Sequence, residues 1–275
     1  MIDRPALIAW RSQAPWPSPV QIEQDLLLSR LMIEIARDDV LGPELVMRGG
    51  TCLNKLHLPT PLRYSEDLDY VRCTRGGIKP YTQALAKVAE EVGLTVSSRQ
   101  RSGQMVHVYF DGQPTEGIGR IRIKIEMNIA ETEPHRPGKT LAHKVETSWW
   151  SGAAEIPTFQ PSELLATKLR ALYQRSKGRD LFDLWLGLTV LKADPEQIIA
   201  GFNHYMRDAA FSFPELRNNL SAKLASTGFR RDLDALTTHL PAGYDPDSAA
   251  DLVLRDLGSR LRNAPPIEEI GTLRP

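Results

Sequence analysis

The sequence predicts an α+β protein, in which a sheet-containing N-terminal domain, residues 1–155, precedes a helical C-terminal domain, residues 156–275. Strand-like patterns occur within residues 44–72 and again within residues 120–128, where apolar and polar side chains alternate. After residue 160 the apolar side chains recur at helical spacing instead. The change follows residues 131–158, which contain several prolines and glycines and which we interpret as a long connection between the two domains.

Composition sets limits on function. The chain has 275 residues, enough to bury a sizeable core, and it contains 34 Lys and Arg against 34 Asp and Glu. No global charge therefore indicates nucleic acid, and any such binding would need a local basic patch. Cys52 and Cys73 are the only cysteines, which predicts a reducing compartment without a disulfide framework. No signal peptide and no long apolar run occurs, so we expect a cytoplasmic protein without a membrane partner.

The first predicted elements are an irregular segment and a helix. Residues 1–17 are rich in proline and tryptophan and are expected to run irregularly over the surface. Ser18 then suits a helix N-cap, with proline at the first helical position and Gln21 closing a capping box. Apolar residues follow at helical spacing until Gly42-Pro43, which stops the element.

A glycine turn and a pair of acids organise the next stretch. An apolar run at residues 45–47 leads into Gly49 and Gly50, and Asp67 and Asp69 lie inside a second strand-like run. Residues two apart on a strand share a face, so the two carboxylates would stand together. Such a pair suits Mg²⁺, which binds few protein carboxylates and takes other ligands from water and phosphates. Backbone N–H groups after a glycine turn favour phosphate, so the combination predicts nucleotide chemistry.

Each half of this pattern is weak alone. A glycine pair is common in turns, and an Asp-x-Asp sequence is commoner on solvated strand edges than in metal sites. Here Thr51 follows the glycines, and Arg63, Ser65 and Glu66 directly precede the acids. That arrangement favours a functional site.

Further strands and a third carboxylate are predicted beyond this stretch. Residues 82–92 have a helical pattern, and residues 94–98 and 105–110 look like short strands, with His107 as a structural or surface residue. In residues 120–128 isoleucines and Met127 occupy one face and polar side chains the other. This could be no more than a half-buried strand. Beside an Asp pair, however, Glu126 becomes the best-placed third carboxylate.

The helical part contains a lysine in an unusual position. A helix is predicted from Pro161, and Lys168 falls within its apolar stripe. An isolated lysine at such a position usually snorkels, so that its ammonium group reaches water. Asp180 and Asp183 follow three residues apart, and Asp183 could pair with Lys168 and hold its ammonium group toward a substrate phosphate. From residue 195 onward we expect further helices, one of them around residues 233–240, and a loosely held tail after Asn263.

These segments resemble a known family. Gly49-Gly50-Thr51, followed by Arg63-Tyr-Ser65-Glu66-Asp67-Leu-Asp69, is similar to the signature of the AbiEii/AbiGii type nucleotidyltransferase toxins, which include the MenT toxins and lie within the DNA polymerase β-like superfamily. Lys124-Ile-Glu126, the run around Lys168 and Arg179-Asp180-Leu-Phe-Asp183 resemble the other three motifs. The loop before Asp67 is longer than usual, and Thr167 stands where the family usually has glutamate.

The resemblance implies a fold, a set of roles and a reaction. The fold would be a polymerase β-like nucleotidyltransferase core with a small mixed sheet, followed by a helical C-terminal domain. The reaction would be attack of an acceptor hydroxyl on an NTP, with release of pyrophosphate. The resemblance implies that Mg²⁺, or alternatively Mn²⁺, is bound by Asp67, Asp69 and Glu126. It implies that the nucleotide is bound by Gly49, Gly50, Thr51, Ser65 and Lys168. Lys168 would be oriented by Asp180 or Asp183, and the site would be supported by Arg63 and Arg179.

The resemblance also implies partners. It predicts a toxin of a type IV-like toxin–antitoxin system that modifies the 3′ end of tRNA and blocks translation, neutralised by a cognate AbiEi-like antitoxin. The residues themselves offer only arginines and lysines that could line a basic groove, namely Arg99, Arg101, Arg120, Arg122, Lys124, Arg170, Arg175, Lys177 and Arg179. Two alternatives stay open: an enzyme that modifies a protein side chain or small molecule, and a catalytically inactive RNA-binding module.

Overall fold

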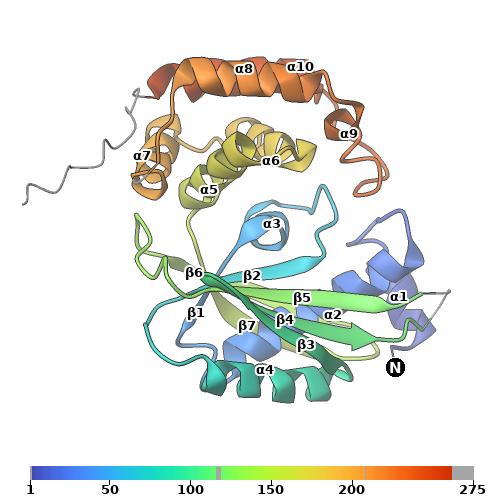
Figure 1. Ribbon diagram of the computed structural model, residues 1–275. Helices are drawn as coiled ribbons and strands as arrows, with labels where there is room; N and C mark the ends of the chain where they lie inside the picture. Colours follow the sequence, from blue (N-terminus) through green and yellow to red (C-terminus); the bar gives the residue numbers. More distant parts are fainter. Residues whose placement is uncertain (1, 116–118, 208, 262–275) are drawn as a thin grey trace, which may run out of the picture. The chain divides into compact units, whose positions relative to one another are not determined.

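The computed structural model describes residues 2–115, 119–207 and 209–261, and the chain forms two compact units. The first unit runs to Gln160 and also includes Ala235–Leu240, while the second begins at Pro161. The predicted boundary after residue 155 falls inside a strand, Ser151–Thr158, so the division lies slightly later in the chain. Each unit is described by itself below (Figure 1).

The first unit contains a sheet and several helices. In chain order they are α1 (Arg4–Trp10), α2 (Pro19–Arg37), β1 (Leu45–Arg48), α3 (Gly49–Cys52), the π-helix η1 (Leu53–His57), β2 (Asp67–Arg72), α4 (Lys79–Val92), β3 (Thr95–Ser102), β4 (Met105–Gly112), β5 (Ile121–Asn128), β6 (Lys139–Glu146) and β7 (Ser151–Thr158).

The sheet is mixed, and its strands lie in the order β3-β4-β5-β2-β1-β7-β6. The central pair β1 and β2 is antiparallel, whereas β5 and β7 run parallel to their inner neighbours β2 and β1. Helices α2 and α4 cover one face, and α3 lies on the opposite side of β2 (Figure 1). Together with the helical second unit, this sheet confirms the predicted α+β class. The seven-stranded sheet is larger than the small sheet that we expected.

Helix α2 begins as the sequence predicts. The Ser18 hydroxyl accepts a hydrogen bond from the backbone N–H of Val20, and the Gln21 side chain accepts one from the N–H of Ser18. This reciprocal arrangement satisfies backbone donors that the first helical turn leaves unpaired. The helix ends at Arg37, before the glycine and proline that we took as its stop.

We expected the N-terminal segment to be irregular, but it contains α1 and contributes to the core. The indole N–H groups of Trp10 and Trp16 donate hydrogen bonds to the two carboxylate oxygens of Asp25, at 2.8 and 2.9 Å. The Lys55 ammonium group lies 2.6 Å from the same carboxylate. The buried acid needs these partners because an uncompensated charge in the core is costly. The tryptophans therefore connect α1 to α2 rather than lying over the surface.

The prediction of a long connection at residues 131–158 is wrong, because β6 and β7 form an antiparallel hairpin there. The prolines and glycines lie before the hairpin or within it and do not prevent pairing at this edge of the sheet. At the turn, the Arg30 guanidinium group lies 4.9 Å from the ring centre of Trp149 and 5.0 Å from that of Trp150. The two tryptophans thus fix the hairpin turn against α2.

The second unit is helical, as predicted. It contains α5 (Pro161–Gln174), α6 (Gly178–Thr189), α7 (Pro195–Tyr205), α8 (Phe213–Leu224), α9 (Thr227–Arg230), α10 (Pro246–Asp256) and a short 3-10 helix, η2 (Gly258–Arg260). Its core is formed by apolar residues from these helices, among them Leu165, Leu169, Leu184, Phe202, Leu220 and Val253. The predicted tail after Asn263 lies outside the described residues.

The helix predicted around residues 233–240 does not form. Residues 235–240 belong to the first unit, where the Leu236 carbonyl accepts a hydrogen bond of 2.6 Å from the backbone N–H of Tyr64.

Throughout the described part of the chain, no helix combines the length and the apolar character needed to cross a membrane.

Candidate functional site

The two carboxylates of β2 stand on one face of the sheet, as their spacing predicts. Asp67 and Asp69 alternate with the buried Leu68 and Tyr70. In the parallel pairing with β5, Asp67 lies opposite Lys124 and Asp69 lies opposite Glu126. Residues opposite each other on neighbouring strands point to the same face. The sheet therefore brings Asp67, Asp69 and Glu126 together on the side that carries α3.

Lys124 lies between two of these acids. Its ammonium group is 2.9 Å from Oδ2 of Asp67 and also forms an ion pair with Oε1 of Glu126. Burial, together with the charges of Asp69 and Glu66, raises the pKa of Asp67 to about 6, although Lys124 opposes the rise. The carboxylate of Asp67 is thus held in a position where its charge is costly and a cation is favoured.

Glu126 has a second neighbour on the other side. The Nε2 atom of His107 on β4 lies 3.4 Å from Oε2 of Glu126. Among the described residues no three acid, histidine or cysteine side chains lie close enough to hold a metal ion. Asp67 and Asp69 do fit Mg²⁺, since this ion uses hard oxygen ligands and takes only one or two protein carboxylates. A third contribution from Glu126 stays a prediction.

The glycine pair makes room for the polar groups around it. Gly49 has φ +84°, a left-handed conformation, and a Cβ atom built on it would lie 1.9 Å from Oδ2 of Asp69. A Cβ atom on Gly50 would lie 2.5 Å from the Arg63 guanidinium group and 2.9 Å from the Ser65 hydroxyl. Only glycine permits such close approach. The motif therefore brings Asp69, Arg63 and Ser65 against the start of α3.

Replacing Gly49 with alanine is expected to reduce both stability and activity. The new Cβ atom would displace the Asp69 carboxylate and would occupy a left-handed conformation, which costs an L-residue about 1–2 kcal/mol. Gly93→Ala is the matched control, because Gly93 has φ +82° and open space around its position. Thermal unfolding should show a larger loss for Gly49→Ala than for Gly93→Ala, and only Gly49→Ala should lose the nucleotide transfer that the family resemblance implies. Equal losses would show that the contact with Asp69 is unimportant.

The Thr51 side chain has a structural role that the sequence did not reveal. This side chain is 0% exposed, and its hydroxyl donates a hydrogen bond of 2.6 Å to the backbone carbonyl of Asp67. It therefore joins α3 to β2 and positions Asp67, and nucleotide binding by Thr51 stays a prediction.

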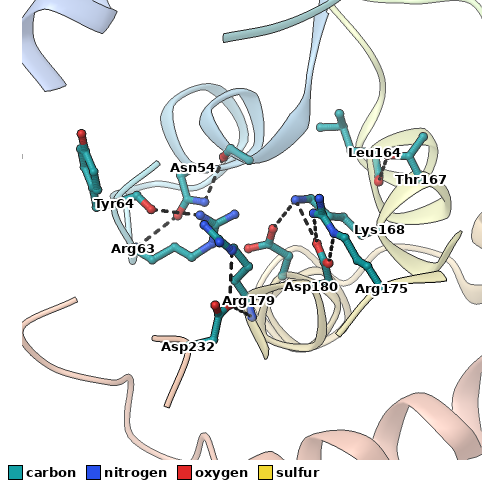
Figure 2. A network of polar contacts seen from close by, with 12 residues as sticks. Asn54, Arg63, Tyr64, Leu164, Thr167, Lys168, Arg175, Arg179, Asp180 and Asp232 are labelled. Atoms are coloured by element: carbon teal, nitrogen blue, oxygen red, sulfur yellow. Dashed lines mark hydrogen bonds and ion pairs between the residues drawn. The ribbon is translucent and has the colours of Figure 1, made fainter. Parts of the chain in front are cut away.

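Asn54 is a residue of the site that sequence reasoning missed. Its side-chain amide donates to the carbonyl of Gly50 at 3.1 Å and accepts from the N–H groups of Leu62 and Arg63 at 3.2 and 3.3 Å. Arg63 in turn donates to the carbonyl of Tyr64 at 3.0 Å (Figure 2). Asn54 thus holds the loop before Asp67 against the glycine pair. The only signal in the sequence was its position one turn after Gly50.

His57, the last residue of η1, should make the stability of the fold depend on pH. Burial, together with the charge of Lys139, lowers the pKa of His57 to about 4. The unfolded chain then takes up a proton near pH 6.5, whereas the folded chain does not do so until about pH 4, so the free energy of unfolding falls over that window. Between pH 7 and pH 5, wild type should lose about 1–2 kcal/mol more than His57→Gln in urea unfolding. Asp67, whose raised pKa acts in the opposite direction, is present in both proteins. Parallel losses would contradict the assignment.

The lysine predicted in the second unit is held by two buried acids. Lys168 of α5 places its ammonium group 2.8 Å from Oδ2 of Asp183 on α6. It also lies 3.6 Å from Oδ1 of Asp180 on the same helix (Figure 2). Both carboxylates are 0% exposed. This geometry confirms the pairing with Asp183 and excludes simple snorkelling. Asp180 is shared, because Arg175 also donates two hydrogen bonds to it, at 2.7 and 2.9 Å.

Other arginines and lysines of the expected basic groove have carboxylate partners. Arg179 lies 3.2 Å and Lys177 lies 3.9 Å from Asp232 in the second unit. In the first unit, Arg120 and Arg122 pair with Asp111. With Lys124 and Arg175 also paired, much of the predicted positive charge is compensated locally. The described contacts therefore do not support an uncompensated basic surface built from these residues.

Comparisons with known proteins agree with this geometry. A family model described as nucleotidyl transferase AbiEii toxin, type IV toxin–antitoxin system, matches residues 30–256. Among solved structures, MenT4, a nucleotidyltransferase toxin from Mycobacterium tuberculosis, superposes with a TM-score of 0.57 at 18% identity, covering 93% of this chain and 90% of that one. The protein JHP933 from Helicobacter pylori gives a TM-score of 0.51 at 16% identity, covering 88% and 90%.

A search of curated protein sequences finds no match. The structural likenesses, at this low identity, establish the fold. The family model spans most of the chain, including both units and every motif from the glycine pair to the acids of α6. The chain therefore belongs to the AbiEii family, the nucleotidyl transferase toxins of type IV toxin–antitoxin systems.

Proposed function

We propose that this chain transfers a nucleotide from an NTP to an acceptor hydroxyl in a reaction that depends on Mg²⁺, or alternatively on Mn²⁺. The observation that carries the proposal is the packing of Asp69 against Gly49, which sets a pair of carboxylates beside the start of a helical segment. Carboxylates suit a hard metal ion, and backbone N–H groups at the start of a helical segment suit phosphate. Both halves of a nucleotide site thus come from one short stretch of chain.

The metal would be held by Asp67 and Asp69, with Glu126 as the predicted third carboxylate. When bound, such an ion neutralises charge that develops on the phosphates during transfer. Glu126 is the candidate to accept the proton of the acceptor hydroxyl, because it lies opposite Asp69 in the sheet. The backbone N–H groups of Gly49 and Gly50 are the candidates to bind the triphosphate, and Arg63 and Ser65 lie against Gly50 to assist.

The role proposed for Lys168 rests on the family resemblance and on the geometry within the second unit. Its ammonium group would neutralise phosphate charge, and Asp183 would orient it. Asp180 and Arg179 would act as supporting residues, since Asp180 lies 3.6 Å from Lys168 and Arg179 is anchored by Asp232.

The proposed acceptor is the 3′ end of tRNA, and its modification would block translation in the cytoplasm. Family membership supports a toxin and hence a cognate antitoxin, which we propose to be AbiEi-like. The tRNA assignment follows from the resemblance alone.

The acceptor can be identified without assuming its nature. A cell extract would be incubated with the protein and an α-labelled NTP, and portions would then be treated with RNase or with protease. The proposal predicts label that RNase removes and protease does not. Label that only protease removes would indicate a protein acceptor, and label in small molecules would indicate a metabolite. If adding the protein produces no labelling at all, an inactive RNA-binding module would be favoured.

A further inference from the structure

The ammonium group of Lys124 lies between two of the three predicted metal ligands, Asp67 and Glu126. It contacts Asp67 on one side and Glu126 on the other, while Asp69 lies opposite Glu126 in the same sheet. The side chains of Lys124, Asp67 and Glu126 are 26%, 28% and 19% exposed, so water screens these charges only in part. Carboxylates collected on one sheet face in this way repel each other.

We propose that Lys124 is the resident counter-ion of this carboxylate cluster, and that its contact with Asp67 and the binding of a divalent metal by Asp67 exclude each other. The inference rests on the proposed function, because it takes Asp67 as a metal ligand. Two cations that share one partly buried carboxylate repel strongly. Metal binding therefore requires Lys124 to leave Asp67.

The position of Lys124 in the sheet makes this exchange possible. Glu126 follows Lys124 by two residues on β5, so both side chains point to one face and their ion pair does not depend on β2. The contact with Asp67, in contrast, joins two strands. His107 lies on the far side of Glu126 and leaves its contact with Lys124 intact. Lys124 thus holds β2 and β5 together without metal and competes with the metal for Asp67.

The test compares metal binding and stability in three full-length proteins: wild type, Lys124→Met and Lys144→Met. Lys144 offers a matched control, because its ammonium group lies 2.6 Å from Glu146 in the same Lys-x-Glu arrangement on β6, with both side chains more than 60% exposed. Mn²⁺ would be titrated calorimetrically in the absence of nucleotide. Thermal unfolding would be followed with EDTA and with Mn²⁺.

The expected results concern affinity and melting temperature. Lys124→Met should bind Mn²⁺ about tenfold more tightly than wild type, because the competing cation is gone. Its melting temperature should fall in EDTA and rise more on Mn²⁺ addition than that of wild type, since Asp67 and Glu126 lose the cation that they share. Lys144→Met should match wild type in both measurements, as expected for an exposed pair. Lys124→Arg, which keeps the charge, should retain the wild-type affinity.

Several outcomes separate this inference from the proposed function. If wild type binds Mn²⁺ and Lys124→Met binds it equally or more weakly, the inference is overturned while the metal site stands. If neither protein binds Mn²⁺, the proposed metal site itself fails and the inference fails with it. Should Lys124→Met not fold in EDTA, Lys124→Gln, which keeps a hydrogen-bond donor between the acids, carries the same comparison.

Discussion

Asp69→Asn is expected to reduce nucleotide transfer by about a thousandfold or more while leaving the fold intact. The substitution keeps the shape of the side chain but removes the charge of the carboxylate that packs against Gly49. If Asp69 binds the metal, several kcal/mol of transition-state stabilisation are lost, and each 1.4 kcal/mol corresponds to a factor of ten. The measurement is the initial rate of transfer from an NTP, together with thermal unfolding to confirm the fold.

A control for this substitution lies on the same sheet. Asp111 of β4 is also a largely buried carboxylate, and it pairs with Arg120 and Arg122. Asp111→Asn removes the same charge but lies away from the glycine pair, so the rate should stay within a few-fold of wild type. A rate of Asp69→Asn close to that of Asp111→Asn would show that Asp69 does not take part in the reaction.

Asp183→Ala is expected to lower the free energy of unfolding by about 3–5 kcal/mol, because it leaves the ammonium group of Lys168 buried with less compensation. Asp180 remains 3.6 Å away but is already engaged by Arg175. Urea unfolding measures the effect. Because Lys168 is also proposed to neutralise phosphate charge, transfer should fall as well.

Two further variants separate stability from function at this pair. Asp247→Ala removes an exposed acid that lies 2.6 Å from Arg230, and it should cost no more than about 1 kcal/mol. The double variant Lys168→Met/Asp183→Leu replaces the buried pair with apolar side chains and should recover most of the lost stability. It should still lack transfer activity. Recovery of both properties would contradict the role proposed for Lys168.

Local patterns in the sequence predicted much of this arrangement. The capping box at Ser18, the shared face of Asp67 and Asp69, and the pairing of Lys168 with Asp183 all depend on residues within one or two neighbouring elements. In such cases the periodicity of a helix or strand fixes which side chains share a face. The predicted α+β class follows from the same periodicities.

The remaining features depend on which strands are neighbours. Lys124 lies between acids because β2 and β5, far apart in the sequence, pair in parallel and in one particular register. The hairpin of β6 and β7 has a largely exposed edge strand, so it lacks the apolar run that would have revealed it. The role of Asp25 needs the fold of α1, which brings Trp10 to it. None of these neighbours can be deduced from local spacing.

The central claim is that the carboxylate pair of β2 supports transfer of the nucleoside monophosphate group of an NTP to an acceptor. Its most direct test uses the purified protein with total tRNA and each NTP in turn, labelled on either the α- or the γ-phosphate, with Mg²⁺ or with EDTA. The account predicts that the α-label enters tRNA, that the γ-label leaves as pyrophosphate, and that EDTA or Asp69→Asn abolishes the transfer. Transfer of the γ-label, or equal transfer by Asp69→Asn, would contradict it.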